Sequence, residues 1–156
     1  METTFYFTEA STSSILSFRE AHADFLDIIK YYLPGLKVVV HCYTDPSVKN
    51  LQELLQVGFY IGLTGVNSDL REGRFITGII REIPLDKLMV ETDSPYLFPR
   101  NLYEERWLRH EDRYQWMNEP CMTSYVVDRI VQVRGDCIEV EVANKTTENA
   151  KEFFRL

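Results

Sequence analysis

The chain has 156 residues, of which 45% are hydrophobic, which is enough for one globular domain with a sizeable core but not for two full domains. Its formal net charge of -7 offers no broad basic face and so argues against unaided binding to duplex nucleic acid through many phosphate contacts. No apolar run approaches the roughly 20 residues that span a bilayer, so no membrane association is expected.

The three cysteines are scattered along the chain, odd in number and without CxxC spacing: Cys42, Cys121 and Cys137. This pattern indicates reduced thiols rather than a disulfide framework. Reduced thiols predict an intracellular protein, located in the cytoplasm or the nucleus.

The first predicted elements alternate between helix and strand. Apolar residues recur at helical spacing over residues 20–33, which predicts an amphipathic helix. Residues 37–42, KVVVHC, form an apolar, β-branched run without alternation, which is typical of a strand covered on both faces. Asp45 and Pro46 are predicted to be the N-cap and first residue of the next helix, which ends before Gly58.

Strands and helices continue to alternate after Gly58, and this order argues for parallel strands joined by right-handed crossovers. Two architectures fit it, a segment of a (β/α)8 barrel and an open doubly wound sheet. The remaining predicted elements are a strand at residues 59–65, a helix around residues 75–80 that ends before Pro84, a strand at residues 87–91, and helices from about residue 119 to 134 and from about 147 to 154.

Side chains able to do chemistry stand at the carboxyl ends of all three predicted strands: His41, Thr64 and Asp93. Functional sites of parallel α/β folds lie at these strand ends, which converge in a barrel, so His41 and Asp93 are expected to face one point. A carboxylate at the top of a buried strand is costly unless it is paired, hydrogen-bonded or bound to a metal. Together with an imidazole it provides a mixed N/O ligand set suited to zinc, manganese or similar ions.

Both residues also have a purely structural interpretation. The sequence Asp93-Ser94-Pro95 is typical of a turn in which Asp bonds backbone amides two residues further on. A histidine that follows three valines is commonly a hydrogen-bonded core residue. The residues alone leave these alternatives open.

Longer stretches of the sequence carry a family resemblance. The series HCYTDP, GFYIGLTG, IPLDKLMVETDSPYLFPRN, NEP and TTENAKEFF resembles the TatD family of metal-dependent hydrolases and deoxyribonucleases. The resemblance covers about residues 18–156 and implies an α/β fold, the C-terminal part of a (β/α)8 TIM barrel that is incomplete in this chain. Residues 1–17 are then a leader unlike the family, and residues 18–156 a TatD-like C-terminal half-barrel.

The resemblance also implies roles for the matched residues. His41 and Asp93 would bind a divalent metal ion, Mg²⁺, Mn²⁺ or Zn²⁺, and Asp93 would in addition be catalytic, accepting the proton of the attacking water. Glu91 would support them from the same strand end. Thr64 would also be a supporting residue, within the IGLTG segment whose small residues leave room near the metal. No substrate-binding residue is assigned.

Several ligands of complete family members are missing from this chain. Such members have a His-x-His pair on the first strand, a glutamate in a GExGLD segment, and a histidine two residues before the arginine of HxREA. That last position is Ser17 here, and His22 lies within the following helix. Weak metal binding is therefore expected. A sheet that does not close would also leave exposed edges through which the chain could self-associate.

The leading hypothesis is a TatD-like metal-dependent deoxyribonuclease, partial or truncated, that hydrolyses phosphodiester bonds in single-stranded DNA or another phosphodiester substrate. The alternative is a catalytically inactive short form or paralogue that acts through protein association. A module binding a small phosphorylated ligand would need a glycine-rich strand-to-helix turn, which the sequence lacks. The loop at residues 102–117 mixes arginines with aromatic residues that could stack bases, but its acidic residues cancel most of the charge.

Overall fold

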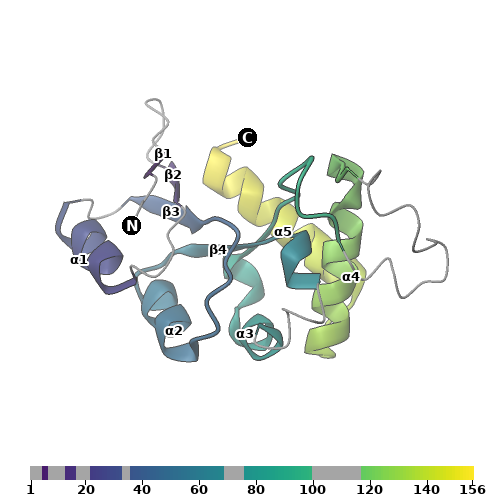
Figure 1. Cartoon of the computed structure of the whole chain (residues 1–156), viewed down its shortest axis with the longest axis horizontal. Coiled ribbons are helices and arrows are strands. Elements are labelled where there is room, and N and C mark those ends of the chain that lie inside the picture. The colour runs from purple at the N-terminus through teal and green to yellow at the C-terminus, as the bar shows by residue number, and fades with distance from the viewer. Residues whose placement is uncertain (1–4, 7–12, 17–21, 33–35, 69–75, 100–116) are drawn as a thin grey trace.

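The computed structural model describes residues 5–6, 13–16, 22–32, 36–68, 76–99 and 117–156 (Figure 1). Ser17, Phe75 and most of the predicted aromatic loop lie outside these residues. Within them, no helix combines the length and the apolar character needed to cross a membrane.

A five-stranded sheet forms the centre of the fold, in the order β1 (Phe5–Tyr6), β2 (Ser13–Leu16), β3 (Lys37–Val40), β4 (Tyr60–Leu63) and β5 (Leu88–Val90). β1 pairs antiparallel with β2, and all other neighbours are parallel. β3, β4 and β5 confirm the three predicted strands. β1 and β2 were not predicted, because their serine- and threonine-rich surroundings show no apolar run. β2 is recognisable as a strand through its pairing with β3.

Helices cover both faces of this sheet. In Figure 1, α1, α2 and α3 lie along one side of the strands, and α5 lies on the other. The helix predicted from residue 119 begins four residues later, after a 3-10 turn at Pro120–Met122. The helices are α1 (His22–Tyr32), α2 (Val48–Gln56), α3 (Thr77–Glu82), α4 (Thr123–Arg134) and α5 (Glu139–Phe154).

The start of α2 corrects the predicted cap. Ser47 is the N-cap, and its Oγ accepts a hydrogen bond from the Asn50 N–H at 3.2 Å. Asp45 lies two residues earlier, and its carboxylate accepts bonds from the Ser47 N–H at 2.8 Å and from Asn50 Nδ2 at 2.7 Å. Asp45 is therefore not the N-cap, but its hydrogen bonds stabilise the loop that contains the N-cap. At the other end Gly58 has a φ of 93°, the left-handed conformation expected of a glycine after a helix.

α5 begins eight residues before its predicted start. The Glu141 carboxylate accepts a hydrogen bond from the Ile138 N–H at 3.1 Å, which satisfies a backbone donor at the beginning of the helix. The first turns were missed because they lack an apolar stripe: Val140 is exposed, and Val142 is the first buried residue of the helix.

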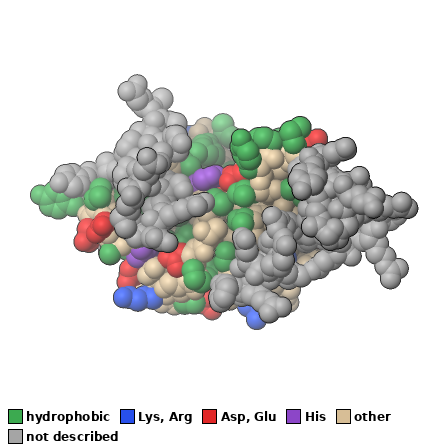
Figure 2. All heavy atoms as spheres, in the orientation of Figure 1, with side chains coloured by type: hydrophobic (Ala, Val, Ile, Leu, Met, Phe, Trp, Pro, Cys, Tyr) green, Lys and Arg blue, Asp and Glu red, His purple; other side chains and the backbone are tan. Residues whose placement is uncertain are grey.

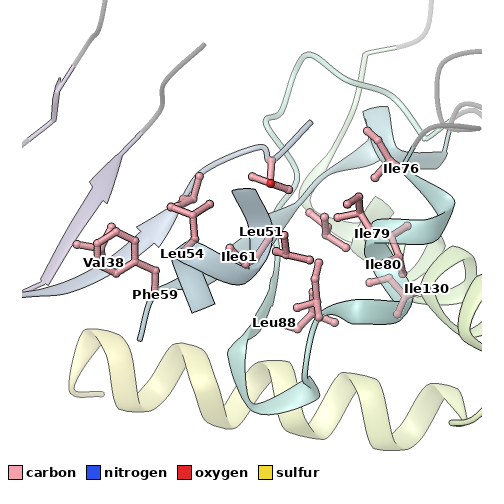
Figure 3. Close-up of a cluster of buried hydrophobic side chains, with 14 of the residues drawn as sticks. Val38, Leu51, Leu54, Phe59, Ile61, Ile76, Ile79, Ile80, Leu88 and Ile130 are labelled. Carbon is pink, nitrogen blue, oxygen red and sulfur yellow. The ribbon is translucent and has the colours of Figure 1, made fainter. Parts of the chain in front are cut away.

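The larger core lies between the sheet and helices α1 to α4 (Figure 3). Alternate residues of the strands enter it, as expected from the twofold side-chain period of a strand. Its members include Phe25, Val38, Val40, Leu51, Leu54, Ile61, Leu63, Ile79, Ile80, Leu88 and Ile130.

A smaller cluster covers the opposite face of the sheet. Phe153 of α5 packs there with Val39, Tyr60 and Met89, and its ring meets the Tyr60 ring edge-on with centroids 5.6 Å apart. Asn149, one turn earlier on α5, is buried and donates hydrogen bonds of 2.7 Å to the carbonyls of Leu85, in the 3-10 turn before β5, and of Leu88, the first residue of β5. The valine run of β3 is thus buried on both faces, as its lack of alternation predicted.

Candidate metal centre

The candidate site lies at the carboxyl ends of β3 and β5. His41 stands two residues after Val39, and Glu91 stands two residues after Met89, so both side chains emerge on the face that α5 partly covers. Figure 2 shows this part of the surface, where a histidine and an acidic side chain adjoin among hydrophobic side chains near the centre of the view. The parallel register of the strands is what brings these residues together.

Three side chains converge there. His41 Nδ1 lies 2.7 Å from Glu91 Oε2, and His41 Nε2 lies 3.3 Å from Asp93 Oδ1. One ligand atom from each residue lies within 4.8 Å of the others. The His41 side chain is 34% exposed and the two carboxylates 19% each, so the group is accessible without being fully solvated. His41 is therefore not a core histidine.

The two carboxylates favour the protonated form of the histidine. The hydrogen bond to Glu91 is the largest cause that raises the pKa of His41 above its usual 6.5, and the charges of Glu91 and Asp93 add to it. Partial burial acts in the opposite direction, because it disfavours the charged ring. Without a metal, the two carboxylates on either side of the ring therefore stabilise its imidazolium form.

This arrangement predicts a pH-dependent stability of the metal-free protein. Because the pKa of folded His41 lies above the unfolded value, its contribution to the free energy of unfolding is fully present below pH 6.5 and is lost as the pH rises through the raised pKa. Urea unfolding in EDTA over this range should show the decline, and His41→Asn should remove that part of it. An identical pH dependence in the variant would contradict the prediction.

The turn interpretation of Asp93 is only half right. The segment does turn, since the Tyr96 N–H donates to the Asp93 backbone carbonyl at 2.7 Å. However, Asp93 cannot bond an amide two residues further on, because that residue is Pro95. Thr92 Oγ1 accepts the bond from the Ser94 N–H instead, at 3.3 Å. The Asp93 carboxylate is thereby left for His41.

Asn118, in the NEP sequence, stabilises the turn after β5 by hydrogen bonds from its side chain. Its side chain is buried, and Nδ2 donates to the carbonyls of Thr92, Tyr96 and Leu97. Asp93 itself has a φ of 55°, a left-handed conformation that Asp and Asn tolerate better than most residues. The NEP letters were noted in the sequence, but their role depends on a contact between distant segments.

Thr64, predicted to be a supporting residue, lies at the end of β4 beside the loop that carries His41 and Cys42. It is fully buried, its Oγ1 lies 3.4 Å from Cys42 Sγ, and its N–H donates to Asn67 Oδ1 at 2.7 Å. Asn67 Nδ2 in turn donates to the Tyr43 carbonyl at 3.0 Å. Thr64 and Asn67 thus tie the loops that follow β3 and β4, and nothing in the sequence singled out Asn67.

Two other predictions concern residues away from the cluster. His22 is the first residue of α1 and its Nε2 lies 3.0 Å from Glu53 Oε2 of α2, in keeping with its predicted place in a helix. None of the three cysteines, all of which lie in the described residues, forms a disulfide, in agreement with their spacing.

A hollow of about 800 Å³ opens beside the cluster. His41, Glu91 and Asp93 line it together with Val39 and Met89 of the sheet. Side chains of α4 and α5 form the remaining wall. The site is therefore open toward the face of the sheet on which α5 packs.

Parallel strands β2 to β5 with helices between them, and a histidine–carboxylate cluster at their carboxyl ends, are the arrangement expected of part of a (β/α)8 barrel. The family model described as TatD related DNase matches residues 14–155. The chain belongs to the TatD family. The match begins within the segment 1–17 that the sequence had set apart as a leader.

Curated relatives resemble nearly the whole chain. A protein of Erwinia amylovora named 3'-5' ssDNA/RNA exonuclease TatD is 37% identical over 149 residues, covering 95% of this chain and 54% of the relative. A protein of the same name from Pectobacterium parmentieri is 38% identical with the same coverage. The chain spans about half the length of the curated relatives it matches.

Solved structures agree on the fold. A TatD family hydrolase from Entamoeba histolytica superposes with a TM-score of 0.73 and 22% identity, covering 90% of this chain and 50% of that one. A TatD homologue from Escherichia coli k12 gives 0.74 and 23%, with coverages of 92% and 50%. The predicted fold, an incomplete TIM barrel, is confirmed: the described strands form an open sheet that corresponds to half of such a protein.

Proposed function

We propose that this chain carries part of the catalytic site of a metal-dependent deoxyribonuclease that hydrolyses phosphodiester bonds in single-stranded DNA. The observation that carries the proposal is the convergence of His41, Glu91 and Asp93 on one face of the sheet, in a member of the TatD family. The relatives named as ssDNA/RNA exonucleases support this substrate class.

The three side chains fit a divalent metal ion by their donor chemistry. Imidazole nitrogen and carboxylate oxygen are ligands of Zn²⁺ and Mn²⁺, and carboxylates also suit Mg²⁺. His41 and Asp93 are the proposed ligands, and the Glu91 carboxylate accepts a hydrogen bond from the other ring nitrogen of His41. Catalytic zinc sites usually have three protein ligands, so two ligands from this chain imply weak binding.

Each residue then has a distinct task in hydrolysis. When bound, the metal ion supplies Lewis-acid polarisation of a phosphoryl oxygen. Glu91 holds Nδ1 of His41 and so directs Nε2 toward Asp93, 3.3 Å away. Asp93 is placed to accept the proton of the attacking water as a general base.

Cleavage of end-labelled single-stranded DNA tests the proposal. Purified protein should shorten the DNA in Mn²⁺ or Mg²⁺, and EDTA should stop the reaction, because the proposed chemistry needs the cation. Absence of cleavage in both Mn²⁺ and Mg²⁺ would contradict the proposal. It would favour a catalytically inactive chain that associates with another protein through β5, which among the described strands ends the sheet.

A further inference from the structure

We propose that Gly62 is a positioning residue, which holds the Glu91 carboxylate against the His41 ring by having no side chain. Gly62 lies in the middle of β4 and pairs with Met89 of β5. A Cβ at this position would lie 2.6 Å from Glu91 Cδ and 2.9 Å from Oε2, and would overlap Oε1. Real Cβ atoms essentially never come closer than 3.0 Å to such atoms. The Glu91 carboxylate therefore occupies the space that a side chain at position 62 would take.

In that space Glu91 makes two hydrogen bonds through the same oxygen. Oε2 lies 2.7 Å from His41 Nδ1 and accepts a bond from the Cys42 N–H at 3.2 Å. A carboxylate that binds one ring nitrogen of a histidine sets the orientation of the ring and leaves the other nitrogen for a metal. Gly62 thus acts on His41 through Glu91.

The space around the other glycines shows that Gly62 differs from a glycine that the backbone requires for folding. A Cβ on Gly65 would overlap the backbone carbonyl of Leu97, which cannot swing away. A Cβ on Gly78, exposed on α3, would meet nothing within 4 Å. At Gly62 the obstacle is the end of a flexible side chain, and its φ lies outside the left-handed region, so alanine fits the backbone once Glu91 has moved.

The test compares Gly62→Ala with Gly78→Ala in three measurements. In a crystal structure of the metal-free Gly62→Ala protein, the 2.7 Å contact between His41 Nδ1 and Glu91 should be broken. The Mn²⁺ dissociation constant should rise about 10- to 100-fold, the usual cost of losing a residue that orients a ligand. The urea midpoint should fall only by what the lost His41–Glu91 contact contributed, because Glu91 can move aside without disturbing the strand. Gly78→Ala should leave the contact and the dissociation constant as in the wild type, and should raise the urea midpoint slightly because alanine is the better helix former.

The same substitution in a Glu91→Ala background shows whether Gly62 acts through Glu91. There Gly62→Ala should cause no further loss of Mn²⁺ affinity, because nothing remains for the Cβ to displace. An unbroken His41–Glu91 contact in the single variant, or an equal affinity loss in both backgrounds, would overturn the proposal. Only the affinity measurement depends on the proposed metal function. Wild-type protein that binds no Mn²⁺ would refute that function, while the metal-free structures would still decide the role of Gly62.

Discussion

Asp93→Asn is expected to reduce metal-dependent cleavage of single-stranded DNA by about 10²- to 10⁴-fold, the usual contribution of a general base. The amide is a weaker metal ligand than the carboxylate and cannot accept the proton of water at neutral pH. Asn also tolerates the left-handed conformation at this position, where φ is 55°, so the turn should persist. The loss should therefore appear in the initial rate of DNA shortening at saturating Mn²⁺ while the far-UV circular dichroism stays unchanged.

Asp86→Asn is a matched control for this variant. Asp86 is an exposed residue of the 3-10 turn at Leu85–Lys87, just before β5, so the same change of charge occurs at the opposite end of the strand. Its cleavage rate should equal that of the wild type. Wild-type cleavage rates in both variants would contradict a catalytic role of Asp93. Equally reduced rates in both variants would indicate a general effect of negative charge.

Phe153→Ala is expected to lower the free energy of unfolding by about 3–5 kcal/mol, the usual cost of deleting a buried phenylalanine. Phe153 is 1% exposed and is the α5 residue of the cluster that buries Val39, Tyr60 and Met89. Its loss would leave a cavity against the sheet and remove the edge-to-face contact with Tyr60. Equilibrium urea unfolding, followed by circular dichroism in EDTA, would measure the change.

The neighbouring Phe154 is the matched control, because it has the same side chain at the next position of α5. It is 48% exposed, and its ring meets that of Phe153 edge-to-face with centroids 4.9 Å apart. Phe154→Ala should cost about 1 kcal/mol, the order of one aromatic pair. Similar losses for the two variants would mean that α5 does not pack on the sheet in solution as described.

The elements that were predicted correctly have strong local signals. The valine run of β3 and the glycine-terminated pattern of α2 can be read from a few adjacent residues. The beginning of α5 could not, because Val140 is exposed and the cap depends on the side chain of Glu141. The N-cap of α2 was misplaced by two residues, since Asp45 and Ser47 are both good caps and their relative positions depend on the path of the loop.

The sequence by itself determined that His41 and Asp93 stand at the ends of apolar strands, because a strand and its final residues are a local pattern. It also determined the family, through short motifs in a characteristic order. The tertiary structure alone decided that Glu91 is the direct partner of His41 and that Gly62 provides the space for it. It decided as well that α5 covers the second face of the sheet. These features depend on strand register and helix packing between distant segments, which no local pattern of residues specifies.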